Sequence, residues 1–273
     1  MALNNMKTAT ITFHAPNNNG SFLQAYALQK YITTHFDNVE NEIIDFQPES
    51  QQQQYAIFRK IHSKKDILRN LISFWHYKAL SKRFLAFSEM REKYLKMTKR
   101  CTTTEEALKI AGNYDLVIAG SDQIWNTTAR DFSEAFFLPG ISKKSTYAVS
   151  CGSHLNEVDC DRICSAMETF ENVSVREIDT REFLEKHTKR SIETVLDPTF
   201  LLTKEDYSGL YDKERILKEK YLFLYTINYD EDALKQTVRV AERLGGCKIV
   251  TPFTGYSACL LYTSPSPRDG LLS

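Results

Sequence analysis

Short apolar runs alternate with amphipathic helical stretches along most of the chain. Residues 7–13, 42–46 and 115–119 are apolar or β-branched, and each run has the length of a buried strand. Between the first two runs, residues 21–33 carry apolar side chains at helical spacing. Further strands are predicted at 144–150, 172–177 and 193–198, and further helices at 104–110, 158–170 and 180–187. This alternation predicts an α/β fold with a parallel sheet.

A charged segment of low apolar content, residues 204–220, divides this pattern. After it the alternation resumes, with a strand at 221–228, a helix at 230–244 and a strand at 247–250. We therefore expect a Rossmann-like amino-terminal lobe over residues 1–210 and the start of a second Rossmann-like lobe over residues 218–257. The polar tract Gln51 to Gln54 is predicted to be a loop.

A helical, aromatic and basic insertion interrupts the first lobe at about residues 55–95. Its basic side chains are Arg59, Lys60, Lys64, Lys65, Arg69, Lys78, Lys82 and Arg83. Three interpretations stay open: a solvated helical face, a surface for an anionic or lipid-linked glycan at a membrane, and a nucleic-acid site. The whole chain carries 35 basic and 35 acidic residues, which disfavours a nucleic-acid partner.

Composition predicts a cytoplasmic protein, with peripheral contact at the inner membrane face as a further expectation. No run approaches the ~18 apolar residues of a membrane span, and the amino terminus has no signal-peptide pattern. The six cysteines form no CxxC pair, so we expect reduced thiols and no metal site.

The last residues, 258–273, do not continue the pattern. They contain Pro265 and Pro267 and resemble a translated transposase adapter of the kind used to prepare sequencing libraries. We expect this segment to be non-native and the natural protein to be longer.

Polar residues stand where the strand at 115–119 ends. Gly120 lets the backbone approach a ligand closely or turn sharply, and Ser121, Asp122 and Gln123 follow it. Ligands bind at the carboxyl ends of strands in open α/β sheets. Asp122 is therefore a candidate acceptor for the proton of a sugar hydroxyl, oriented by Gln123, although Ser121 or Asp122 could instead cap a helical turn. Trp125 could stack on a sugar ring or fill the core beneath the loop.

A second candidate site follows the first strand. Asn17, Asn18 and Gly20 precede a helix, whose free N–H groups can bind anions, and Gln24 leans back over its first turn. The alternative is a capped helix with no ligand. His14 is a candidate acid or base, or else a hydrogen-bonded core residue. The loop has no GxGxxG pattern, so it gives no support for nucleotide binding.

Two later strands also end in charged residues. Arg176 and Glu177 could form an anion clamp or a local ion pair, and Asp197 before Pro198 could serve only to fix a turn. Cys151 is expected to be a small core residue, because the sequence places no histidine partner beside it.

Four segments, in this order and at this spacing, resemble the polysaccharide pyruvyl transferase family. They are NNNGSFLQAYAL at 17–28, GSDQIWN at 120–126, SVRE at 174–177 and LDPT at 196–199. The resemblance covers about Thr8 to Thr251. Asn19 departs from it, since the family usually has an aromatic residue there.

The resemblance implies a two-lobed fold like that of GT-B glycosyltransferases. It also implies transfer of the enolpyruvyl unit of phosphoenolpyruvate to a sugar in exopolysaccharide or cell-surface glycan synthesis, without a cofactor. The family's Arg-x-His-Gly motif of the second lobe is missing from this chain, so we expect the fragment to be inactive alone. The alternatives are a GT-B glycosyltransferase that uses a nucleotide sugar and a non-catalytic glycan-binding module.

Overall fold

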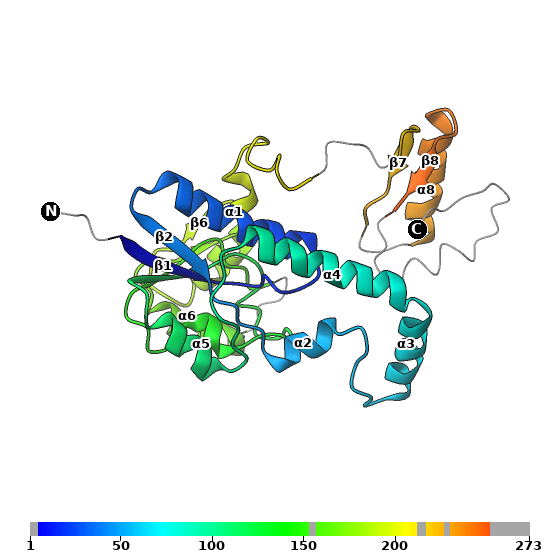
Figure 1. Ribbon diagram of the computed structural model, residues 1–273. Coiled ribbons are helices and arrows are strands. Elements are labelled where there is room, and N and C mark those ends of the chain that lie inside the picture. The colour runs from blue at the N-terminus through cyan, green and yellow to red at the C-terminus, as the bar shows by residue number, and fades with distance from the viewer. Residues whose placement is uncertain (1–4, 153–156, 212–216, 227–229, 252–273) are drawn as a thin grey trace. The chain divides into compact units, whose positions relative to one another are not determined.

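The computed structural model describes residues 5–152, 157–211, 217–226 and 230–251 (Figure 1). The chain divides into two units, residues 1–207 and 208–273, which are considered separately. The adapter-like segment predicted at 258–273 lies outside the described residues.

The first unit is built on a parallel sheet. Its strands are β1 (Met6–Ile11), β2 (Val39–Ile43), β3 (Leu116–Ala119), β4 (Lys144–Thr146), β5 (Ser174–Val175) and β6 (Glu193–Thr194). The first four form one sheet in the order β2-β1-β3-β4, and β5 pairs with β6. Parallel bridges from Ser145 to Asn172 and from Val149 to Val175 connect the two parts. The predicted α/β fold with a Rossmann-like parallel sheet is confirmed.

Helices lie on both faces of this sheet (Figure 1). They are α1 (Asn19–His35) on one face, and α5 (Thr104–Ala111) and α6 (Glu157–Met167) on the other. Strand alternation explains this division. Ala9 and Val117 pack in the main core with α5 and α6, whereas Thr12 lies toward α1 and bonds its Gln24. Two shorter segments, α7 (Ile178–Leu184) and the 3-10 helix η2 (Pro198–Phe200), flank β5 and β6 in the sequence.

A close approach of α1 to the sheet requires Gly120. A Cβ atom at this position would lie 3.0 Å from Thr10 Cγ2 and 3.2 Å from Thr12 Cβ, with Leu28 Cδ2 of α1 at 3.4 Å. Real Cβ contacts are rarely so short, so a larger residue would push strand and helix apart. The sequence predicted a role for this glycine in a ligand's approach, and the structure shows that its neighbours are side chains of the fold.

The insertion contains three helices, α2 (Glu49–Tyr55), α3 (Lys64–Trp75) and α4 (Tyr77–Tyr94). The prediction of a loop at Gln51 to Gln54 was wrong, because these residues belong to α2. The tract has no apolar periodicity, yet Gln51 is buried and hydrogen-bonds the buried carboxyl of Asp131. A polar contact with a distant segment therefore holds a helix that the local pattern does not indicate.

The second unit contains a β-α-β segment. Strands β7 (Tyr221–Phe223) and β8 (Lys248–Val250) pair in parallel, and α8 (Glu231–Arg243) connects them. Asp230 caps this helix by accepting a hydrogen bond from the Ala233 N–H at 2.7 Å. This matches the order of elements that the sequence predicts for residues 221–250.

Candidate functional site

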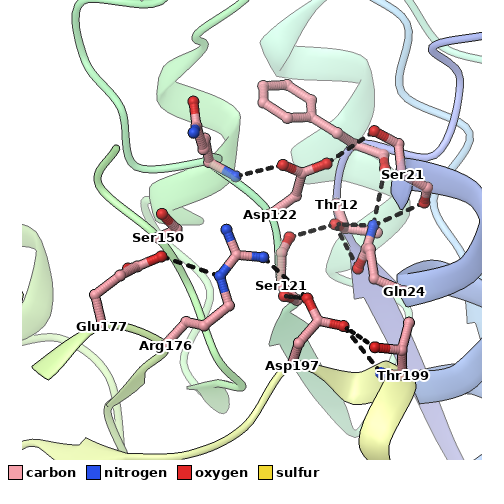
Figure 2. A network of polar contacts seen from close by, with 12 residues as sticks. Thr12, Ser21, Gln24, Ser121, Asp122, Ser150, Arg176, Glu177, Asp197 and Thr199 are labelled. Carbon is pink, nitrogen blue, oxygen red and sulfur yellow. Dashed lines mark hydrogen bonds and ion pairs between the residues drawn. The ribbon is translucent and has the colours of Figure 1, made fainter. Parts of the chain in front are cut away.

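The strand order places a site between β1 and β3. The chain passes from β1 to β2 on one side of β1, and β3 lies on the other side. The loops that leave the carboxyl ends of β1 and β3 therefore run in opposite directions. Such a switch point is where open α/β sheets bind ligands. Polar side chains from the ends of β1, β3, β5 and β6 meet there in one network (Figure 2).

Asp122 lies at the centre of this switch point. Its Oδ2 accepts a hydrogen bond from Ser21 Oγ at 2.9 Å, and its Oδ1 accepts one from the Gln123 N–H at 2.8 Å. The backbone of Asp122 has φ +78°, a left-handed conformation that aspartate and asparagine tolerate best. The Ser150 N–H donates to its carbonyl at 3.0 Å and ties the loop to β4. The half-buried carboxylate is thus fixed by α1 and by its own loop, and the left-handed backbone beneath it is tied to the segment after β4.

Gln24 ties the first turn of α1 to the end of β1. It is 2% exposed, and its Nε2 donates to Thr12 Oγ1 at 3.1 Å, to the Phe13 carbonyl at 2.9 Å and to the Ser21 carbonyl at 3.0 Å. Thr12 Oγ1 in turn donates to the Ser121 carbonyl at 2.6 Å. The amide predicted to meet a ligand is therefore used to align Ser21 with Asp122.

The asparagine run before α1 has a structural role. Asn18 is the N-cap residue, and its Oδ1 accepts from the Gly20 N–H at 2.7 Å. Asn17 bonds two arginines of α4: its carbonyl accepts from Arg83 Nη2 at 2.7 Å and its Oδ1 from Arg91 Nη1 at 3.3 Å. The geometry shows a capped helix that is held against the insertion, and anion binding by this loop stays a prediction.

Arg176, predicted either as an anion clamp or as part of an ion pair, forms two ion pairs. Its Nε lies 3.0 Å from Glu177 Oε1 and its Nη1 lies 2.9 Å from Asp197 Oδ2. Asp197 also accepts from the Thr199 N–H and hydroxyl, and from Ser121 Oγ at 3.3 Å. Arg176 therefore holds the ends of β5 and β6 beside the loop after β3.

Burial disfavours the charged forms of Arg176 and Asp197, but the hydrogen-bond partners of these side chains outweigh the effect of burial. Burial lowers the pKa of Arg176, but its hydrogen bonds with Glu177 and Asp197 raise the pKa above its ordinary value. Burial raises the pKa of Asp197, but bonds from Thr199 and Arg176 bring the pKa below its ordinary value. Glu177 Oε2 is buried with no hydrogen-bond partner among the described residues.

The network as a whole is acidic. Three carboxylates, those of Asp122, Glu177 and Asp197, face one guanidinium that is already paired twice. Such a set suits hydrogen bonds from hydroxyl groups and removal of their protons. It offers no uncommitted cation for a phosphate.

Two predicted site residues lie in the core instead. His14 is 0% exposed, and its Nε2 lies 2.9 Å from Asp45 Oδ1, so it presents no surface to a substrate. Trp125 is also 0% exposed; its Nε1 donates to the Phe136 carbonyl at 3.3 Å and its ring packs on Phe170. The structure thus shows the core alternative for both side chains.

Four members of the network were neither predicted site residues nor noted as charged strand ends: Thr12, Ser21, Ser150 and Thr199. The Ser21–Asp122 bond joins positions 101 residues apart, which no local pattern reveals. Thr12 and Ser21 could be identified only by their place in the sequence, because they flank a loop that leaves the carboxyl end of a strand.

In the described part of the chain, no group of histidine, cysteine or acidic side chains could hold a metal ion. No helix in that part is long and apolar enough to cross a membrane.

Fold and site together define a Rossmann-like α/β protein with an acidic cluster of polar side chains at its switch point. The sequence model of the family described as polysaccharide pyruvyl transferase matches residues 18–253, most of the chain. The chain belongs to this family, which is a family of transferases. Searches of curated proteins and of solved structures found no match.

Proposed function

We propose that this protein transfers the enolpyruvyl unit of phosphoenolpyruvate to a glycan sugar, in exopolysaccharide or cell-surface glycan synthesis. The products are a pyruvate ketal and free phosphate. The reaction protonates the methylene carbon of the donor, removes protons from two sugar hydroxyls and breaks the bond to phosphate. It therefore needs a base beside the sugar and cations beside the donor.

The position of Asp122 is the observation that supports the proposal. Its carboxylate is half-buried at the switch point and held by the hydroxyl of Ser21. We assign it the proton of the attacking sugar hydroxyl. Gln123, exposed beside it, is placed to orient the sugar.

The donor requires groups that this cluster does not supply. Arg176 forms ion pairs with two carboxylates of the cluster, so its positive charge is already neutralised. We therefore place the cations for phosphoenolpyruvate outside the cluster, in a second lobe of a GT-B-like arrangement. We further propose that the 273-residue chain is inactive alone and that a longer parent protein, with a complete second lobe, is the enzyme.

The insertion supports a further proposal, of peripheral contact between a cytoplasmic enzyme and an anionic membrane. On α3, Leu68, Leu71, Phe74 and Trp75 are between 55% and 83% exposed. Exposed lysines accompany them: Lys64, Lys65, Lys78 and Lys82. Lys64 and Lys65 share α3 with the apolar side chains, and Lys78 and Lys82 follow on α4. Neighbouring apolar and basic side chains are typical of attachment to anionic lipid surfaces, where lipid-linked acceptors would be found.

Phosphate release tests the proposed reaction. The parent protein, given phosphoenolpyruvate and a glycan acceptor, should release phosphate, while the 273-residue chain should release none. Consumption of a nucleotide sugar without consumption of phosphoenolpyruvate would support a GT-B glycosyltransferase instead. Sugar binding without turnover of either donor would support a glycan-binding module.

A further inference from the structure

A cavity of about 560 Å³ lies where the insertion meets the carboxyl ends of β1 and β2. Its size is within the range of small-molecule sites. Four aromatic rings line it, those of Tyr55, Phe58, Tyr77 and Phe84. The rings of Phe58 and Tyr77 stack on each other with centroids 5.8 Å apart, which fixes their orientation. Flat aromatic faces beside amide groups are suited to the apolar faces and hydroxyls of sugar rings.

The charged side chains that line this cavity are both arginines. Arg91 is 7% exposed, and its Nη1 donates to the Ala15 carbonyl at 3.0 Å and to Asn17 Oδ1. No carboxylate in the described ranges forms an ion pair with it. Arg100 is largely exposed and uses Nε to bond Asp45, which leaves its two terminal nitrogens toward solvent. The lining contains no acidic side chain, and Asp45 behind it forms an ion pair with Arg100 but not with Arg91, so the cavity favours an anionic group.

An unpartnered buried acceptor also lines the cavity. Gln51 is 3% exposed, and its Oε1 has no hydrogen-bond partner among the described residues. Its amide bonds Asp131, which leaves the carbonyl oxygen for another donor. Buried polar atoms without partners are rare in folded proteins. A ligand hydroxyl donating to Gln51 Oε1 would satisfy it.

The cavity lies close to the acidic network. Asn17 lines it from the loop that leads into α1, two residues before that helix begins. Tyr55 lines it from α2, and burial, followed by the charges of Asp131 and Asp122, raises the pKa of its hydroxyl to about 12. The loop that Asn17 belongs to continues into α1, whose Ser21 bonds Asp122 at 2.9 Å, so the segment 17–21 joins the cavity to the acidic network.

We propose that this cavity binds the acceptor through a sugar ring that carries a carboxylate or a phosphate. The inference rests on the proposed function, because it makes the cavity the acceptor subsite of the Asp122 site. The rings hold the sugar, Arg91 and Arg100 bind its anionic group, and Gln51 accepts from a hydroxyl. Phosphoenolpyruvate has no ring to use the four aromatic faces, and the cavity is large for it.

Saturation-transfer NMR on the 273-residue chain tests this inference directly. The probes are glucuronate, glucose 6-phosphate, glucose and inorganic phosphate. We expect both acidic sugars to bind more tightly than glucose, and the tighter of the two identifies the anionic group. Arg100→Gln should weaken their binding about tenfold, as loss of a charged hydrogen bond does. Tyr77→Ala should weaken it severalfold by removing a stacking face. Both side chains are exposed, so neither change removes a core residue.

Lys99→Gln is the matched control, since it removes one exposed charge next to Arg100 but outside the cavity lining. It should leave binding unchanged. Glucose binding as tightly as the acidic sugars, or acidic-sugar binding unaffected by Arg100→Gln, would overturn the inference. So would binding of inorganic phosphate alone without any effect of Tyr77→Ala.

Binding and phosphate-release assays on the parent protein distinguish failure of this inference from failure of the proposed function. Acidic-sugar binding without phosphate release from phosphoenolpyruvate would refute the reaction and leave the cavity assignment standing. Phosphate release with neutral acceptors, unaffected by Arg100→Gln, would refute the cavity assignment and leave the reaction standing.

Discussion

Replacing Asp45 by asparagine should destabilise the first unit in a pH-dependent way. Asp45 Oδ1 accepts from His14 Nε2 at 2.9 Å and from Gln47 Nε2 at 2.6 Å, while Oδ2 accepts from Arg100 Nε at 3.1 Å. Burial raises its pKa, but the bonds from His14, Gln47 and Arg100 outweigh burial and lower the pKa from 3.8 to about 2. The carboxylate thus joins the end of β1 to two side chains that line the cavity.

The lowered pKa sets the size and the pH range of the effect. Because the folded pKa lies below the unfolded one, folding favours the ionised form. The contribution is fully present above pH 4 to 5 and is lost as the pH falls through about 2. A shift of this size corresponds to about 2 kcal/mol at neutral pH and about 1 kcal/mol at pH 3. Asp45→Asn should lower the free energy of unfolding by these amounts.

Denaturant unfolding, followed by tryptophan fluorescence from pH 3 to 7, measures this difference. Both tryptophans, Trp75 and Trp125, lie in the first unit, so their emission reports on that unit. Asp37→Asn is the control, since it neutralises an exposed carboxylate after α1. A stability difference that is the same at pH 3 and pH 7 would refute the reasoning, as would no difference at pH 7.

Two further predictions concern the backbone near the site and the exposed helix. Gly152 has φ +76°, and a Cβ there would lie 2.6 Å from Asn126 Nδ2, whereas Gly140 has φ +78° and open space around it. Gly152→Ala should therefore cost about 2 kcal/mol of unfolding free energy and Gly140→Ala about 1 kcal/mol; equal costs would show that Asn126 yields without penalty. Trp75→Ser should reduce sedimentation with anionic vesicles at low salt, while Phe36→Ser, also at an exposed position, should not. Absence of vesicle binding by the unmodified chain at low salt, or binding that persists in high salt, would rule out the proposed membrane contact.

The sequence points to the candidate site through the ends of its strands. Strand ends can be predicted because apolar runs stop at them, and parallel strands bring these ends to one edge. For that reason Asp122, Arg176 and Glu177 were identifiable as candidates, and Asp197 was noted at the end of another strand. What the pattern left open was whether each polar group faces a ligand or another part of the chain.

Contacts between distant segments decided that question. Arg176 is turned toward Asp197, Gln24 toward the backbone of β1, and His14 toward Asp45. Each partner lies on another element, so hydrophobic periodicity contains no information about the pairing. The buried Gln51 and the cavity beside it escaped prediction for the same reason, since α2 is stabilised by tertiary contacts rather than by its own pattern.

The most direct test of the account is the rate of phosphate release by the parent protein carrying Asp122→Asn. Asparagine keeps the left-handed backbone and can still accept from the Gln123 N–H, but it cannot take a proton. Ser21→Ala, which removes only the hydroxyl that bonds the carboxylate, is the companion variant. We expect Asp122→Asn to lower the maximal rate by about 10²- to 10⁴-fold, with a smaller loss for Ser21→Ala and acidic-sugar binding retained in both. An Asp122→Asn enzyme that releases phosphate at the rate of the unmodified protein would contradict the account.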